Sequence, residues 1–154
     1  MVSKINQITR YGAYGIVLTD LKLLLTQKRG GPFKGLWDLP GGGIEFNETP
    51  EEALKRELIE ETALAAEGFE FFSIKTFNGE YDNEEGRYAF HHIGIIYKVA
   101  NTTPVSGFVP AEDARWFIPH EISLDQLTPF AKYVVEELVK GPGTFHKSAM
   151  SMIR

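Results

Sequence analysis

Residues 42–64 read GGIEFNETPEEALKRELIEETAL, and this stretch specifies a helix together with the chemistry that the helix carries. Thr49 is a good N-cap, Pro50 suits the first helical position, and Glu52 completes a Thr-x-x-Glu capping box. These signals predict a helix that begins at Pro50 and continues to about Glu61.

Three acidic residues of this predicted helix share one face. Glu57, Glu60 and Glu61 stand at positions i, i+3 and i+4, which lie together when the chain turns by ~100° per residue. Leu54 and Leu58 form the neighbouring apolar stripe, so the carboxylates border the buried side. Carboxylates at this spacing repel one another, and a hard divalent cation such as Mg²⁺ or Mn²⁺ would remove the repulsion. The face therefore predicts a metal site, with a solvated acidic face as the alternative.

A longer pattern with fixed gaps connects this face to the residues ahead of the helix. Gly42 is followed after five residues by Glu48, and after seven more by Arg56-Glu57-Leu58-x-Glu60-Glu61. The pattern resembles the signature of the Nudix hydrolases, G-x5-E-x7-R-E-U-x-E-E-x-G-U with U an aliphatic residue, and spans Gly42 to Leu64. The preceding Trp37-Asp38-Leu39-Pro40-Gly41 is also similar to the usual lead-in of that family.

This resemblance implies a fold, an activity and a set of site residues. The fold would be an α/β/α sandwich with a mixed β-sheet, here as a single domain over residues 1–154. The activity would be hydrolysis of a nucleoside diphosphate linked to another moiety X. Similar enzymes imply metal ligands at Gly42 (through its carbonyl), Glu57, Glu60 and Glu61. They imply catalytic roles for Glu57, Glu60, Arg56 and Glu112, of which Arg56 would orient the cluster.

One position departs from the signature. Ala63 stands where the family has its second glycine. That glycine helps the chain to turn out of the helix, which alanine does less easily if the backbone needs a positive φ. Because the position supplies no ligand, the substitution bears on local geometry more than on activity.

The remaining sequence predicts further strands and one more helix around this motif. Strands both before and between two helices indicate an α/β domain with a mixed sheet. We expect a strand pair or one bent strand at 14–19 and 21–26, strands at 69–77 and 90–99 separated by a polar loop at 78–87, a short strand at 114–118, a helix at 129–140, and a C-terminal tail at 141–154.

Substrate-binding candidates outside the signature are supported by less specific patterns. Lys28 and Arg29 end a predicted strand and could meet phosphates, although a solvated strand end is an equal alternative. Trp37, Tyr81 and Phe130 could stack on a base, with core packing as the alternative for each. The position of Tyr81, 17 residues after the signature, resembles that of the tyrosine in dinucleoside polyphosphate hydrolases (81 − 64 = 17).

Two further groups of polar residues are less specific still. His91 and His92 alternate between the faces of a predicted strand, so one should point inward and be packed or hydrogen-bonded. A catalytic base could also come from the polar loop, whose acids are Glu80, Asp82, Glu84 and Glu85, with a solvated loop as the alternative.

Composition limits the classes of partner and compartment. The 154 residues carry 16 basic and 21 acidic side chains, a formal charge of −5, which argues against non-specific nucleic-acid binding. The chain has no cysteine, which excludes disulfides, thiolate nucleophiles and cysteine-bound zinc. No apolar run approaches the ~20 residues of a membrane helix, and no signal peptide is evident. We therefore expect a cytoplasmic protein with a small nucleotide substrate, and a homodimer stays open.

The favoured function is a Mg²⁺- or Mn²⁺-dependent hydrolase of the MutT-like type. It would convert a (deoxy)nucleoside triphosphate to the monophosphate and pyrophosphate. The alternatives are a hydrolase of dinucleoside polyphosphates, ADP-ribose or nucleotide sugars, and a non-catalytic nucleotide sensor on the same fold. A structural Ca²⁺ domain is disfavoured because the acids lie on a helix and not in a ligand-rich loop.

Overall fold

A computed structural model describes residues 5–140, so the expected tail at 141–154 lies outside the described residues. No helix within residues 5–140 is long and apolar enough to cross a membrane. Two single-turn 3-10 helices, at Pro119–Glu121 and Leu124–Gln126, precede the last helix. The main elements are β1 (Asn6–Thr19), β2 (Lys22–Gln27), β3 (Trp37–Asp38), β4 (Gly41–Gly43), α1 (Pro50–Thr62), β5 (Leu64–Asn83), β6 (Gly86–Pro104), β7 (Ala114–Phe117) and α2 (Pro129–Val139).

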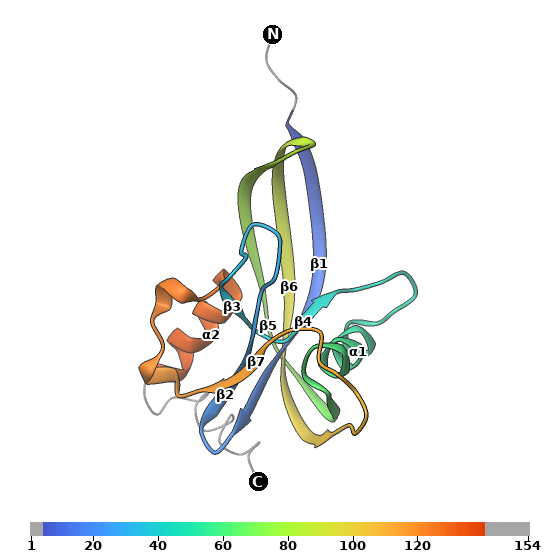
Figure 1. Ribbon diagram of the computed structural model, residues 1–154, viewed down its shortest axis with the longest axis vertical. Coiled ribbons are helices and arrows are strands. Elements are labelled where there is room, and N and C mark those ends of the chain that lie inside the picture. Colours follow the sequence, from blue (N-terminus) through green and yellow to red (C-terminus); the bar gives the residue numbers. More distant parts are fainter. Residues whose placement is uncertain (1–4, 141–154) are drawn as a thin grey trace.

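The strands form one mixed sheet between the two helices, as expected. Its order is β3-β2-β1-β6-β5, with β4 paired to β1 and β7 paired to β2. β1 and β6 run parallel from Asn6↔Tyr88 to Val17↔Val99, whereas the other named pairs are antiparallel. α1 and α2 lie on opposite sides of the sheet (Figure 1). The predicted α/β/α sandwich is confirmed.

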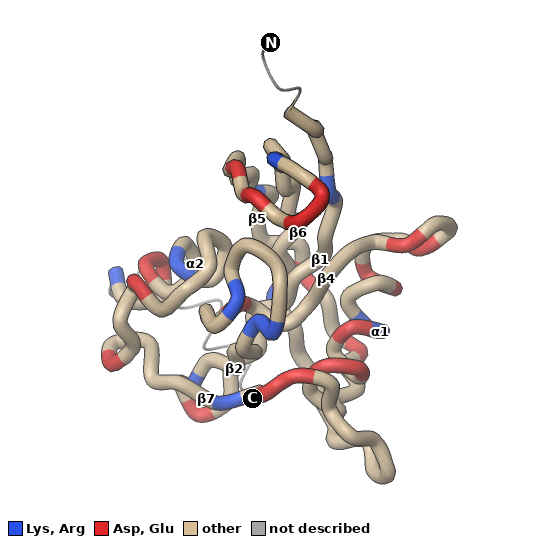
Figure 2. Tube along the Cα trace, turned by 45° about the horizontal axis from the view of Figure 1, so that its top comes forward, with Lys and Arg blue, Asp and Glu red and all other residues tan. Residues whose placement is uncertain are grey.

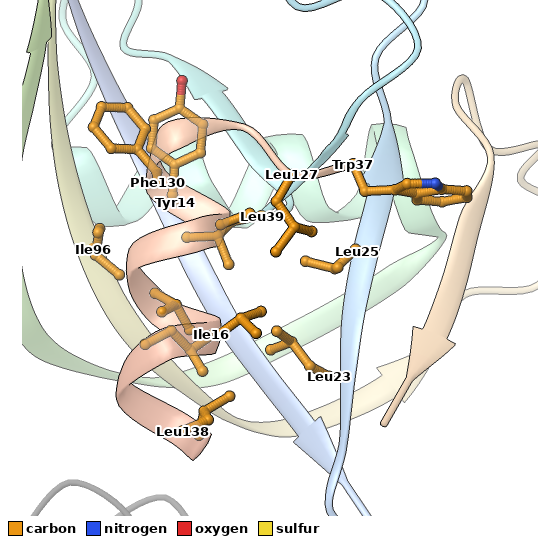
Figure 3. Packing of buried hydrophobic residues seen from close by; sticks show 13 residues of the cluster. Tyr14, Ile16, Leu23, Leu25, Trp37, Leu39, Ile96, Leu127, Phe130 and Leu138 are labelled. Carbon is orange, nitrogen blue, oxygen red and sulfur yellow. The ribbon is translucent and has the colours of Figure 1, made fainter. Parts of the chain in front are cut away.

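Alternation along β1 sends its side chains into two separate cores. Tyr14 and Ile16 belong to the core beneath α2, which Figure 3 shows. Ala13 and Val17 belong to the core beneath α1, together with Leu54 of that helix. β1 is therefore covered on both faces, which explains why its central residues read as a continuous small and apolar run.

The prediction of a polar loop at residues 78–87 is wrong. β5 and β6 continue through this segment, and only Glu84 and Glu85 form the turn between them. The polar side chains belong to a long hairpin held by cross-strand contacts: Tyr81 pairs with Tyr88, their rings stacked at 5.7 Å. Of the acids in this segment, Glu80 and Asp82 are accordingly on an exposed strand and Glu84 and Glu85 are in the turn, and Arg87 binds Glu80 at 2.9 Å.

The other predicted elements agree with the structure to within a few residues. The segments at 14–19 and 21–26 are a strand pair and not one bent strand, because Asp20 and Leu21 form a tight turn with φ of 51° and 63°. β1 begins earlier than predicted, at Asn6, and this extension carries residues of the site described below.

The end of α1 depends on the residue that departs from the signature. Ala63 is left-handed, with φ 57° and ψ 31°, and its N–H donates to the carbonyl of Ile59 at 3.0 Å. This is a helix end that glycine adopts without penalty and alanine does not. The chain therefore makes the turn that the family's glycine makes, at a cost in backbone strain.

We predict that Ala63→Gly raises the free energy of unfolding by about 1 kcal/mol, because it removes the left-handed penalty on a residue with a Cβ. Urea unfolding followed by circular dichroism measures the change. Ala65→Gly is the matched control: this residue lies in β5, where glycine should lower stability by about 0.5–1 kcal/mol. An Ala63→Gly variant no more stable than the wild type would contradict the strain argument.

Candidate active site

Arg56 fastens the loop before α1 onto the helix. Its Nε donates to Glu48 Oε2 at 2.8 Å and its Nη2 to Glu48 Oε1 at 2.9 Å, a bidentate pair. Nη2 also donates to the carbonyl of Gly43 at 3.1 Å. The guanidinium holds the pKa of Glu48 at about 2, so this carboxylate is charged at any physiological pH. The helix start itself forms as predicted, with Thr49 Oγ1 accepting from Glu52 N at 3.2 Å.

The same guanidinium reaches two acids of the predicted cluster. Arg56 Nη1 donates to Glu57 Oε1 at 2.9 Å and to Glu60 Oε2 at 3.3 Å. The expected repulsion on this face is therefore relieved in part by a cation one residue before Glu57. Glu60 is the outermost of the three acids, with 47% of its side chain exposed.

Glu61 turns the other way, into the protein. Its side chain is buried, and Oε1 accepts a hydrogen bond from the N–H of Gly41 at 2.8 Å. Burial raises the pKa of Glu61, and the negative charges of Glu112 and Glu57 raise it further. Burial also raises the pKa of Glu57, although Arg56 opposes the shift. The fold thus holds neighbouring carboxylates where their charge is costly.

Gly42 brings the backbone against one of these carboxylates. A Cβ at this position would lie 2.8 Å from both Cδ and Oε1 of Glu57, so any other residue here would displace the Glu57 carboxylate. Gly41 must also be glycine. Its φ is 140°, and a Cβ there would collide with the carbonyl oxygen of Ala13. The predicted neighbour relation between Gly42 and the acidic face is present.

Glu112 joins the cluster from the chain that leads into β7. Its Oε2 is buried without a hydrogen-bond partner. Its charge raises the pKa of both Glu61 and Asp38, so it faces these acids. The N–H of the preceding Ala111 donates to the carbonyl of Glu60 at 2.8 Å, which ties this segment to α1. Figure 2 shows the acidic residues of α1 and of this segment close together. A buried, unpaired carboxylate oxygen is costly unless a ligand pairs with it.

These residues suit a hard divalent cation by their chemistry. Carboxylates and the carbonyl of Gly42 supply only oxygen, and the unpaired Glu112 oxygen lacks a partner that a cation would provide. Within residues 5–140, no three acidic or histidine side chains converge as a ready ligand set. The reason is that Arg56 holds Glu57 and Glu60, while Gly41 holds Glu61. A cation would have to compete with Arg56 for the first two.

A cleft of about 320 Å³ adjoins the cluster at Gly42. Lys28 lines this cleft, and its positive charge lowers the pKa of Glu57 and Glu61, so it faces the acids. The walls farther from the acids are aromatic, and they are formed by Phe33, Phe77, Tyr81, Phe90 and Phe130. A volume of this size fits a small ligand with one flat ring system.

The substrate-binding candidates separate into two groups. Lys28, Tyr81 and Phe130 line the cleft. Arg29 instead approaches Asp113 at 3.9 Å and is absent from the cleft lining. Trp37 is buried in the core with its ring 4.9 Å from that of Phe117, and Figure 3 shows it at the other end of the core from Tyr14 and Phe130.

Several cleft residues were missing from the sequence-based candidates. Arg10 and Tyr14 line the cleft from β1, and Asp38 lines it from β3. Asp38 is buried and accepts hydrogen bonds from Leu39 N at 2.8 Å and Thr128 Oγ1 at 2.6 Å. Alternation would have placed Arg10 on the face of Tyr14, but the predicted strand began only at Tyr14. Of the two adjacent histidines, one of which was expected to point inward, it is His92 that lines the cleft.

Comparison with known proteins identifies the class that this fold and site define. Residues 9–138 match the NUDIX domain family, so the chain belongs to that family. The MutT NUDIX hydrolase from Burkholderia pseudomallei has a similar fold, with a TM-score of 0.67 and 24% identity over 86% of this chain and 98% of that one.

Curated relatives carry several activities in their names. The 8-oxo-dGTP diphosphatase of Haemophilus influenzae is 36% identical over 94% of this chain and 99% of its own length. The RNA pyrophosphohydrolase of Rhizobium meliloti is 34% identical over 68% of this chain and 71% of the relative. The ADP-ribose pyrophosphatase of Methanocaldococcus jannaschii is 39% identical over 54% of this chain, which spans only 46% of that protein.

The buried charge of Glu61 predicts a pH-dependent gain in stability for Glu61→Gln in the presence of a chelator. Because the folded-state pKa of Glu61 is raised above 4.5, wild-type stability falls as pH rises from 4.5 toward that higher value. The variant lacks this loss, so its advantage should be absent at pH 4.5 and reach about 1 kcal/mol or more at pH 8.

Urea unfolding at a series of pH values measures the difference, and Glu60→Gln is the control because its half-exposed side chain carries little desolvation. A Glu61→Gln variant whose advantage did not grow with pH would show that this carboxylate is not strained by burial.

Proposed function

We propose that this protein hydrolyses the pyrophosphate linkage of a nucleoside diphosphate attached to a moiety X. The main substrate class would be (deoxy)nucleoside triphosphates, cleaved to the monophosphate and pyrophosphate. The observation that carries the proposal is the junction at Gly42, where the carboxylates of α1 meet an aromatic-walled cleft of nucleoside size. The full-length relative named as an 8-oxo-dGTP diphosphatase supports the same class.

Mg²⁺ or Mn²⁺ is the cofactor of this proposal, held by Glu57, Glu60, Glu61 and the Gly42 carbonyl. Such an ion, when bound, neutralises phosphate charge and makes bound water more acidic. The support from this chain is the oxygen-only donor set that these residues supply.

The other residues have distinct roles in the proposal. Glu112 Oε2 accepts the proton of the attacking water, since it is a buried acceptor that no group of the described chain occupies. Arg56 orients Glu57 and Glu60 through its hydrogen bonds at 2.9 and 3.3 Å. Lys28 binds phosphate at the end of the cleft next to the acids.

Dinucleoside polyphosphates are a second candidate class. Tyr81 lines the cleft and stacks on Tyr88, which extends an aromatic surface along the hairpin beyond the space of one nucleoside. A substrate panel with dATP, dGTP, 8-oxo-dGTP, diadenosine polyphosphates, ADP-ribose and 5′-triphosphate RNA distinguishes the classes. In this proposal the partner is a small nucleotide, and the chain is a single domain over 1–154. The location is the cytoplasm, and a homodimer stays open.

We predict that turnover requires a divalent ion and that Glu57→Gln and Glu61→Gln each lower it by about 10²–10⁴-fold, because each variant removes charge that would hold the ion. Pyrophosphate release with Mg²⁺, with Mn²⁺ and with excess chelator gives the measurement. Glu80→Gln, on the exposed hairpin, is the control that should keep wild-type turnover. Full activity in chelator, or in both site variants, would leave these acids as a solvated face and remove the metal assignment.

The site of attack gives a separate prediction. In ¹⁸O-labelled water, a nucleoside triphosphate should yield monophosphate and pyrophosphate with one label in one of these two products, because in this proposal the internal bridge would lie across the acidic cluster. Mass analysis of the products locates the label. Labelled orthophosphate as the only labelled product would mean attack at the terminal phosphorus and would exclude this mechanism.

A further inference from the structure

Arg10 and His92 face the cleft side by side. They are registered partners in the parallel pairing of β1 with β6, so their side chains leave the same face of the sheet on strands ~4.8 Å apart. Both residues line the cleft. Within residues 5–140, no acidic side chain forms an ion pair with Arg10, so its donors stay available to a ligand.

Packing fixes the orientation of the His92 ring. Its Nε2 lies 2.8 Å from the hydroxyl of Tyr14, and the rings of Tyr14 and Phe130 meet it edge-on at 5.7 and 5.1 Å. Gly94 allows this arrangement, since a Cβ there would lie 2.8 Å from the ring of Phe130. His92 is therefore a rigid part of the cleft wall.

The hydrogen-bond pattern determines which nitrogen of His92 carries the proton. The side chain of Tyr14 is buried, and within the described chain His92 is the hydrogen-bond partner of its hydroxyl. We assign the hydroxyl as the donor and Nε2 as the acceptor, because the described chain offers the hydroxyl hydrogen no other acceptor.

The remaining nitrogen of His92 is consequently a donor that reaches the cleft. Burial lowers the pKa of His92 to about 4, and the charges of Arg10 and Lys28 act in the same direction, so the ring is neutral near pH 7. A neutral ring that accepts at Nε2 carries its hydrogen on Nδ1. In residues 5–140, the buried side-chain N and O atoms without a hydrogen-bond partner are Thr26 Oγ1 and Glu112 Oε2. Nδ1 of His92 is not among them, so it is not sealed off from solvent without a partner.

We propose that Arg10 and His92 form a pair of hydrogen-bond donors that selects nucleotides with a 6-oxopurine base over adenine nucleotides. The outer edge of guanine presents two acceptors, N7 and O6, whereas adenine replaces O6 with an amino donor. Two donors on this wall match the first edge, whereas in adenine one of them would face the amino donor instead of an acceptor. The inference rests on the proposed function only in placing a nucleoside in this cleft.

The rest of the lining agrees with this selection. The carboxylate of the cleft, Asp38, is anchored in the wall through Oδ1, which accepts hydrogen bonds from Leu39 N and Thr128 Oγ1. The aromatic side chains of Phe33 and Tyr81 can hold a purine plane without reading its edge. An 8-oxo group leaves O6 in place, so oxidised guanine nucleotides stay within the selected class.

Binding of product monophosphates tests the donor pair without hydrolysis. Calorimetry on the full chain should show GMP and IMP binding about 10-fold or more tighter than AMP, as expected for one well-placed donor pair. IMP keeps N7 and O6 but lacks the 2-amino group. Equal affinity for GMP and AMP, or IMP binding as weakly as AMP, would overturn the proposal, the second because the base would then be read through its 2-amino group.

Variants locate the effect on the two residues. Arg10→Met and His92→Phe should each bring the GMP-to-AMP affinity ratio to within about 3-fold of one. Arg10 is exposed, so its variant leaves the core intact if His92→Phe fails to fold. His91→Phe is the matched control, because His91 lines a different hollow with Gln7 and Thr9 and should keep the wild-type ratio. An unchanged ratio in Arg10→Met, or in a folded His92→Phe, sinks the assignment.

The two hypotheses fail separately. Selective GMP binding by a protein that hydrolyses none of the nucleotides of the panel would contradict the proposed hydrolase activity and still support the donor pair. Hydrolysis of dGTP and dATP with equal kcat/KM would sink the donor pair and leave the hydrolase standing.

Discussion

The contact that the site depends on is the hydrogen bond from Gly41 N to the buried carboxylate of Glu61, at 2.8 Å. It holds β4 against α1 and brings Gly42 so close to Glu57 that a side chain at Gly42 would displace the Glu57 carboxylate. The same short strand pairs with β1 through Ala13 and Tyr14. One contact therefore fixes the acidic helix, the glycine segment and the central strand relative to one another, and the cleft opens at their junction.

This geometry has an electrostatic cost that the neighbouring residues only partly offset. Burial raises the pKa of Glu61 and of Glu57, and the unpaired Glu112 adds charge of the same sign. Arg56 offsets the part that it reaches, through Glu57 and Glu60, and it is itself held by Glu48. A site that concentrates charge in this way is typical of one that binds an ion or develops charge during a reaction.

The sequence predicted most accurately what depends on neighbouring residues. The Thr49 N-cap, the proline at the first turn and the acidic face of α1 are local patterns, and each appears in the structure. The prediction of a loop at 78–87 was wrong because cross-strand pairs such as Tyr81 with Tyr88 hold this segment as a hairpin. Composition does not reveal such pairs. Trp37 and Tyr81 looked alike as stacking candidates, but only packing distinguishes a core ring from a cleft ring. Glu112 was reachable through the family resemblance, and Arg10 was not.

The parallel pairing of β1 with β6 explains how the two ends of the cleft stay aligned. β1 contacts the glycine segment through Ala13, and three residues earlier it places Arg10 opposite His92. Tyr14 links the two ends, because its hydroxyl fixes His92 while its backbone pairs with Gly41. Because one continuous strand carries both sets of contacts, the spacing between Arg10 and the glycine segment beside the acids is set by strand geometry and not by a loop. In the proposed complex, this fixed spacing would hold the base at Arg10 while the phosphates reach the acidic cluster.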